Sequence, residues 1–235
     1  RNIAIGYRAY DNADAEDDNL AIGYDALGGS IAGGEYNVAV GNYSLDANTS
    51  GDNNVGVGYE ALSGNTTGSS NTMVGFGAGK ANTTGGANTF VGTNAGNSST
   101  TGDGNTFIGR NAGNANTTGW DNTFVGKDAG ENVTTADRNT FLGGSAGRLT
   151  TTGAYNTFIG EAAGSSNTTG GQNTFVGMKV GEIKNVTLDT NEAYGEHNQE
   201  AIQEVSKDVF PPDFEFVVSA TVQGQGPNGQ PVVAK

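Results

Sequence analysis

Residues 105–121 read NTFIGRNAGNANTTGWD, and residues 122–138 read NTFVGKDAGENVTTADR, which is the same pattern 17 residues later. Eleven such copies follow one another, and nine of the ten intervals between them are 17 residues long. The copies begin at Asn2, Asn19, Asn37, Asn54, Asn71, Asn88, Asn105, Asn122, Asn139, Asn156 and Asn173. A fixed period of this kind is typical of a solenoid, in which each copy forms one coil.

The residue types within a copy indicate the kind of coil. Counted from the leading asparagine, position four is always β-branched or leucine, position five is always glycine, and positions thirteen to fifteen are usually Thr-Thr-Gly. Helical solenoids need about 33–47 residues per unit, so this period is too short for them. Positions two to four suit a short strand and the Gly-Asn-Thr stretches suit turns. We therefore predict an all-β fold, a parallel β-solenoid of about eleven coils stacked at ~4.8 Å.

Composition argues against a globular domain. Only 34% of the 235 residues are hydrophobic and 40 are glycine, whereas a compact domain usually carries about 45–50% apolar residues. Disorder suits such a composition but not its strict register. Asparagines stacked one coil apart are expected to form a hydrogen-bonded ladder.

Side-chain sizes at positions three and nine exchange along the chain. In the first four copies position three is alanine or glycine and position nine is tyrosine or leucine, as in Ala39 and Leu45. From the fifth copy onward position three is methionine or phenylalanine and position nine is glycine, as in Phe107 and Gly113. Volume is conserved within each copy, as close packing requires of two side chains that share one space. The two positions are therefore predicted to face each other inside the coil.

A thin coil of this kind looks marginal on its own. Three or four buried apolar side chains at roughly 1.5–3 kcal/mol each compare poorly with about 1–2 kcal/mol of backbone entropy for each ordered residue. Association of several chains along a common axis would bury a second face. We therefore expect a parallel homotrimer.

Charge and residue inventory exclude several function classes. The formal net charge of −14 disfavours nucleic acid as a partner, and the chain has no apolar run long enough for membrane insertion. Cysteine is absent and His197 is the single histidine, so we predict no catalytic residues, no metal site and no cofactor. An acidic run contains Asp11, Asp14, Glu16, Asp17 and Asp18. It occurs once, and a solvated turn is favoured over a calcium site.

The copies resemble two known groups of repeats. NVAVGNYSLDANTSGDN and NTFVGTNAGNSSTTGDG are similar to the head repeats of trimeric autotransporter adhesins, and more similar to the Asn-Thr-x-x-Gly…Thr-Thr-Gly arrays of bacteriophage tail fibres. The resemblance covers residues 2–181, about three quarters of the chain. It implies a trimeric β-roll at a virion or bacterial surface. The chain departs from the adhesin repeats in its longer period and in its phenylalanines.

Aromatic residues supply the candidate contact sites. Tyr7, Tyr24, Tyr59 and Phe76 share position six, interrupted by Asn42, and Trp120 falls in a turn. They are candidates for contact with a host glycan or receptor, although cross-coil stacking or a subunit contact is the favoured explanation of the column. The position-three phenylalanines are predicted to pack between coils or between subunits; they are Phe90, Phe107, Phe124, Phe141, Phe158 and Phe175.

The repeat dissolves after Gly181, which divides the chain into a solenoid domain over residues 1–187 and a C-terminal segment over 188–235. Residues 191–210 show helical spacing of apolar side chains and precede Pro211-Pro212, which predicts a short amphipathic helix. Two strands around a Gly-Pro-Asn-Gly turn are predicted to follow. This small α+β segment would cap, trimerise or attach the rod.

Together these features predict a non-enzymatic structural protein, the trimeric rod of a phage tail fibre or other virion appendage that presents a host-binding surface. Its expected partners are two further copies of itself, another fibre or virion protein at one end, and a host surface glycan or protein. The head of a bacterial surface adhesin is the alternative within the same class. A polysaccharide depolymerase needs paired carboxylates, and Glu60 and Glu161 lie six copies apart. An ice-binding solenoid needs flat threonine rows, which turn glycines interrupt here.

Overall fold

The computed structural model describes residues 1–11, 18–29, 32–177, 222–225 and 231–234. Residue contacts divide the chain into two units, Arg1–Asn185 and Val186–Lys235. In the second unit, strands β12 (Val222–Gln225) and β13 (Pro231–Ala234) pair antiparallel. The helix predicted within residues 191–210 lies outside the described residues.

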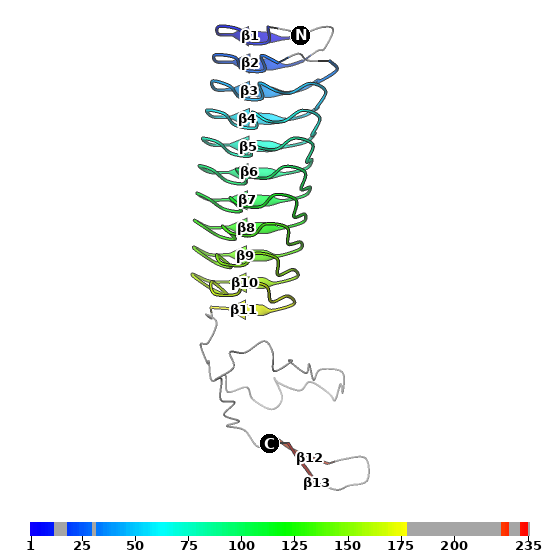
Figure 1. The fold of residues 1–235 in the computed structure, drawn as a ribbon, viewed down its shortest axis with the longest axis vertical. Helices are drawn as coiled ribbons and strands as arrows, with labels where there is room; N and C mark the ends of the chain where they lie inside the picture. The colour runs from blue at the N-terminus through cyan, green and yellow to red at the C-terminus, as the bar shows by residue number, and fades with distance from the viewer. Residues whose placement is uncertain (12–17, 30–31, 178–221, 226–230, 235) are drawn as a thin grey trace. The chain divides into compact units, whose positions relative to one another are not determined.

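The first unit is a parallel β-solenoid, which confirms the predicted class (Figure 1). Each copy contributes one three-residue strand at positions two to four, and the strands pair in chain order in a single eleven-stranded parallel sheet. The strands are β1 (Ile3–Ile5), β2 (Leu20–Ile22), β3 (Val38–Val40), β4 (Val55–Val57), β5 (Thr72–Val74), β6 (Thr89–Val91), β7 (Thr106–Ile108), β8 (Thr123–Val125), β9 (Thr140–Leu142), β10 (Thr157–Ile159) and β11 (Thr174–Val176). No helix occurs in the described ranges. Coil n below begins at the nth repeat asparagine.

Each coil turns at the same backbone positions. Position five has φ near +135°, as at Gly109, a conformation that is essentially restricted to glycine. A Cβ at Gly92 would also lie 2.6 Å from the Gly109 carbonyl oxygen of the next coil. Positions seven, nine and seventeen are left-handed in successive coils, as at Asn111, Gly113 and Asp121. The repeat period is thus fixed by the places where the backbone reverses.

The interior confirms that positions three and nine share one space. Phenylalanine rings from position three stack along the axis with centroids 4.6–4.9 Å apart and nearly parallel planes. A Cβ at Gly130 would lie only 2.6 Å from Cδ2 of Phe124 in the same coil. In the N-terminal coils the large side chain comes from position nine instead. Leu45 at position nine is fully buried, and Ala39 at position three of the same coil is fully buried as well.

Position one confirms the predicted asparagine ladder. From Asn19 to Asn173, each backbone N–H donates to the side-chain oxygen of the preceding repeat asparagine at 2.8–3.1 Å. The side-chain amide also donates to a carbonyl near the end of its own coil, as from Asn105 to Gly119 at 2.8 Å. The ladder therefore joins neighbouring coils and closes each coil, and it satisfies buried polar groups that are otherwise costly.

Position twelve carries a second row of buried residues, which are polar except in coil 8. In five of the eight coils from 3 to 10 it is asparagine, and the side-chain oxygen of Asn116 accepts from the backbone N–H of Gly119 at 3.0 Å. A Cβ at Gly119 would approach that oxygen at 2.5 Å. Coil 8 has Val133 at position twelve and Ala136 at position fifteen. Alanine at position fifteen thus occurs where the asparagine side chain is absent, although coils 6 and 9 also lack the asparagine and keep glycine there.

Candidate binding surfaces

The outer face of the sheet carries a continuous aliphatic stripe. Strands bury position three and turn positions two and four outward. Position four is valine, isoleucine or leucine in all eleven strands, and Ile108, Leu142 and Ile159 are 39–40% exposed. Position two is aliphatic in β1 to β4 and threonine from β5 onward. No charged residue occupies either position, so the face is uncharged on a strongly acidic chain.

A ladder of aromatic rings follows one edge of coils 1–5. Tyr7 and Tyr24 stack with ring centroids 5.3 Å apart, and Tyr59 and Phe76 stack at 5.4 Å. At coil 3, where position six is Asn42, Tyr43 from the next position fills the gap in the column and lies 5.4 Å from Tyr24 and 5.9 Å from Tyr59 in edge-on geometry. The structure thus brings the four predicted residues together and adds a fifth ring between them.

The charged residues near this ladder come from positions seven and ten. Arg8 pairs with Asp25 at 3.3 Å and Lys80 with Glu60 at 2.6 Å. The hydrogen bond that Lys80 donates to the Glu60 carboxylate raises the pKa of Lys80. Burial raises the pKa of Asp46 to about 6, and Asp25 and Glu60 add to that shift through charge repulsion. The edge combines apolar rings with partly neutralised carboxylates.

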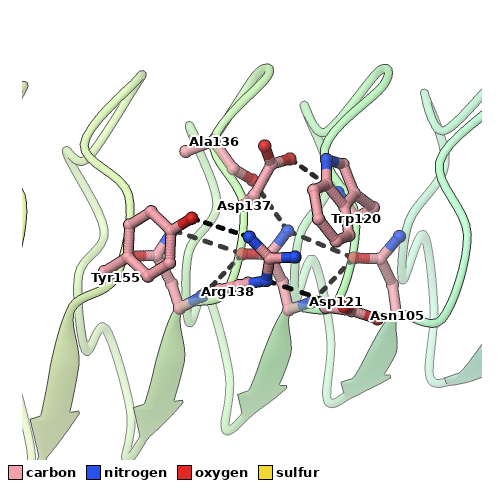
Figure 2. A network of polar contacts seen from close by, with 9 residues as sticks. Asn105, Trp120, Asp121, Ala136, Asp137, Arg138 and Tyr155 are labelled. Carbon is pink, nitrogen blue, oxygen red and sulfur yellow. Dashed lines mark hydrogen bonds and ion pairs between the residues drawn. The ribbon is translucent and has the colours of Figure 1, made fainter.

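A second cluster lies on the turns of coils 7–9, where Figure 2 shows the Arg138 side chain between two aromatic rings. The guanidinium carbon is 3.8 Å from the centroid of the Trp120 ring and 5.5 Å from that of Tyr155. Arg138 donates to the Tyr155 hydroxyl at 2.6 Å and lies 3.9 Å from a carboxylate oxygen of Asp121. Asp137 accepts from the backbone N–H of Trp120 at 3.0 Å. Trp120, a lone candidate by sequence, is therefore one part of a five-residue cluster.

The phenylalanines predicted for packing lie inside the solenoid. Five of them are fully buried and stack on rings of the adjacent coils, while Phe175 in the last described coil is partly buried. The five buried rings contact only their own chain in this arrangement. They position the outer surfaces and do not form part of them.

The acidic run and the single histidine were the remaining candidates for metal binding or catalysis. Asp14, Glu16, Asp17 and His197 lie outside the described residues. Within the ranges that are described, no group of three or more histidine, cysteine or acidic residues is placed to hold a metal ion. The same ranges contain no helix with the length and hydropathy needed to span a membrane. Glu60, one of the two carboxylates weighed for glycoside chemistry, is paired with Lys80.

Comparison with known proteins adds no relative. No protein family model, no curated protein and no solved structure matches this chain. The surfaces therefore have to be interpreted from their own residues.

Three residues of these surfaces were missed from the sequence. Tyr43 was overlooked because it occupies position seven and not six, and the register of the column hid it. Arg138 and Tyr155 both occupy position seventeen, one and two coils after the coil that contains Trp120. Aligning the copies in rows places Tyr43 beside the position-six column and places Arg138 and Tyr155 beside Trp120, but only the structure shows that the side chains make contact.

Proposed function

We propose that this chain is a non-enzymatic structural protein, one of three parallel chains that form the rod of a phage tail fibre or similar virion appendage and present lateral contacts to a host surface. The aliphatic stripe at position four carries this proposal. It runs through all eleven strands, it is partly exposed in the single chain, and it is uncharged. Exposed apolar surface of such extent marks an interaction site.

A second copy of the same chain fits the stripe better than an unrelated partner. Parallel copies have the same rise per coil, so each position-four side chain meets its counterpart along the whole length. A threefold axis parallel to the solenoid closes such a contact into a ring of three chains. Three chains, as opposed to two, follow from the resemblance to trimeric fibre repeats. Threefold presentation of weak lateral contacts would raise avidity for a host surface. A bacterial surface adhesin is the alternative setting for the same assembly.

The solution mass of the protein tests the assembly. One chain weighs 23.8 kDa, so light scattering after size exclusion is expected to give three times that value. Replacing Val57, Val91 and Val125 together by lysine places charge on the stripe and is expected to yield single chains. The matched control replaces Thr67, Thr101 and Thr135 by lysine, which are exposed turn residues of the same coils, and is expected to keep the wild-type mass. A wild-type mass of one chain would overturn the proposal.

A further inference from the structure

The turns at positions sixteen and seventeen change character in coils 7–9. In coils 4 and 5 these positions hold only serine, glycine and alanine, as at Ser69, Ser70, Gly86 and Ala87. Coils 7–9 place tryptophan, arginine and tyrosine at the same turns. The backbone follows the same course in both regions, with position seventeen left-handed throughout. The fold therefore does not require large side chains at these turns.

The cluster also contributes nothing to the interior. Trp120 is 38% exposed and Tyr155 is 52% exposed, and the core beneath them is already closed by the asparagine ladder. Exposed aromatic side chains at the surface of a rod increase unfavourable contact with water unless a partner covers them. Their presence at adjacent turns is better explained by a ligand than by stability.

The side chains are held in a fixed arrangement before any ligand binds. Arg138 is restrained by its stacking on Trp120 and by its hydrogen bond to the Tyr155 hydroxyl. Backbone hydrogen bonds at 3.0–3.1 Å join the three turns, from Arg138 to Trp120 and from Tyr155 to Asp137. A restrained site loses less conformational entropy on binding than a mobile one.

Polar groups of the cluster are left available around the rings. Among the described residues, none accepts a hydrogen bond from the indole N–H of Trp120. The Tyr155 hydroxyl accepts from Arg138 and keeps its own proton to donate. Asp121 is 54% exposed and lies only loosely beside the guanidinium, at 3.9 Å. Apolar ring surface with donors and acceptors at its border suits a ligand that has both a C–H face and hydroxyl groups.

We propose that Trp120, Arg138 and Tyr155, with Asp121 and Asp137, form a binding site for a neutral saccharide. A pyranose ring stacks its C–H face on the aromatic surface and exchanges hydrogen bonds with the carboxylates, the indole N–H and the guanidinium. Asp103, Asp121 and Asp137 lie on consecutive turns against the single positive charge of Arg138. Their repulsion excludes sialylated or sulfated sugars. This inference rests on the proposed role in host contact and names its chemistry.

The aromatic ladder of coils 1–5 is less suited to the same ligand. Its rings pack against one another at 5.3–5.9 Å, so the inner rings offer mainly edges to a partner. In the turn cluster, Arg138 covers one face of Trp120, and no ring or cation covers the other within the described residues. Exposed ring surface is what a sugar needs for stacking, and Trp120 and Tyr155 are 38% and 52% exposed.

Trp120 is the sole tryptophan of the chain, so its fluorescence reports on this site alone. The full chain is first applied to an array of neutral, sialylated and sulfated glycans, and the strongest neutral glycan is then titrated while tryptophan emission is recorded. We expect binding to neutral glycans with a change in emission. Arg138→Ala and Tyr155→Ala are each expected to weaken binding at least tenfold. Tyr36→Ala, which removes an exposed tyrosine at the end of coil 2, is expected to leave it unchanged.

The same variants separate this site from the assembly. Circular dichroism and solution mass are expected to be unchanged in Arg138→Ala and Tyr155→Ala, because neither residue lies on the strand face. Absence of binding to any neutral glycan would overturn the saccharide site and leave the trimeric rod intact. Binding only to anionic glycans, or equal binding by wild type and both variants, would overturn it as well.

Discussion

In coils 2–4 the interior is filled from position nine, by Leu27, Leu45 and Leu62, whereas in coils 6–10 it is filled from position three by phenylalanine. The strand register continues without a break where the two regions meet, since Gly56 of β4 pairs directly with Met73 of β5. The cross-section of the coil is therefore set by the backbone and its ladders. The sequence has to supply one large side chain per coil, from either side.

The two arrangements differ in backbone strain. Position nine is left-handed in both regions, with φ of 54° at Leu45 and 58° at Gly113. A left-handed conformation costs about 1–2 kcal/mol in a residue with a Cβ, and glycine avoids that cost. The phenylalanine arrangement thus relieves the strain at position nine and adds a stacked column of rings. In the leucine arrangement position nine stays strained. The outer face of these coils is more apolar, because position two is aliphatic there as well as position four.

Removal of the large interior residue is expected to have the largest effect in either region. Phe124→Ala should lower the free energy of unfolding by about 3–5 kcal/mol and Leu45→Ala by about 2–5 kcal/mol, because each leaves a cavity at the axis. Denaturant unfolding followed by circular dichroism measures both. Thr118→Ala, an exposed turn substitution in coil 7, serves as the control and should stay within about 0.5 kcal/mol of wild type. A cost below about 1 kcal/mol for Phe124→Ala would show that the rings do not fill the core.

The asparagine ladder is common to both regions, so its loss should be equally costly in each. Asn54→Ala and Asn122→Ala each leave buried backbone groups without partners. Each such group costs about 1–3 kcal/mol. The same unfolding measurement applied to both variants should give values that agree within about 1 kcal/mol. A large cost in one region only would mean that the regions differ in more than their apolar residues.

The aromatic ladder belongs to the N-terminal region alone and should contribute less. Tyr43→Ala removes two edge-on ring contacts, and such pairs are worth roughly 0.5–1.5 kcal/mol each. We expect a small decrease in thermal stability and a reduced near-ultraviolet circular dichroism signal from the tyrosines. Thr93→Ala, at position six of coil 6, has no ring neighbour of this kind and should change neither quantity. An unchanged signal in Tyr43→Ala would indicate that the rings are not stacked in solution.

The remaining expected effect is a pH dependence that arises in the N-terminal region. The pKa of Asp46 is raised by burial from 3.8 to about 6, so the folded state favours the protonated carboxyl. Its contribution to stability is therefore present below about pH 4 and is lost as the pH rises through 6. Asp46→Asn cannot ionise, and its stability relative to wild type should increase between pH 4 and 7. Parallel pH profiles for the two proteins would contradict the raised pKa of Asp46.

Much of the fold was predictable because the same residue pattern occurs in eleven successive copies. The period, the glycine at position five and the exchange of sizes between Ala39 and Leu45 or Phe107 and Gly113 each follow from local geometry that every coil must satisfy. The ladder at position one was predictable for the same reason. When the same residue type recurs every 17 residues, its copies are expected to lie above one another in successive coils.

The candidate sites were less predictable because they depart from the repeat. Tyr43 joins the ring ladder from a neighbouring position, which depends on side-chain direction and not on register. Arg138 lies over Trp120 because the left-handed turn at position seventeen directs its side chain toward the preceding coil. Likewise, only the contact between positions twelve and fifteen explains why alanine at position 136 is compatible with Val133.

The central claim is that positions three and nine fill one interior space, and a double substitution tests it most directly. Gly130→Leu alone should be strongly destabilising, because a Cβ there meets Phe124 at 2.6 Å and overpacking typically costs about 1–3 kcal/mol. Adding Phe124→Ala recreates the arrangement of coil 3, so the double variant should be more stable than Gly130→Leu and no less stable than Phe124→Ala. Denaturant unfolding of the four proteins gives the coupling energy between the two sites. Additive losses, with the double variant less stable than either single variant, would contradict the account.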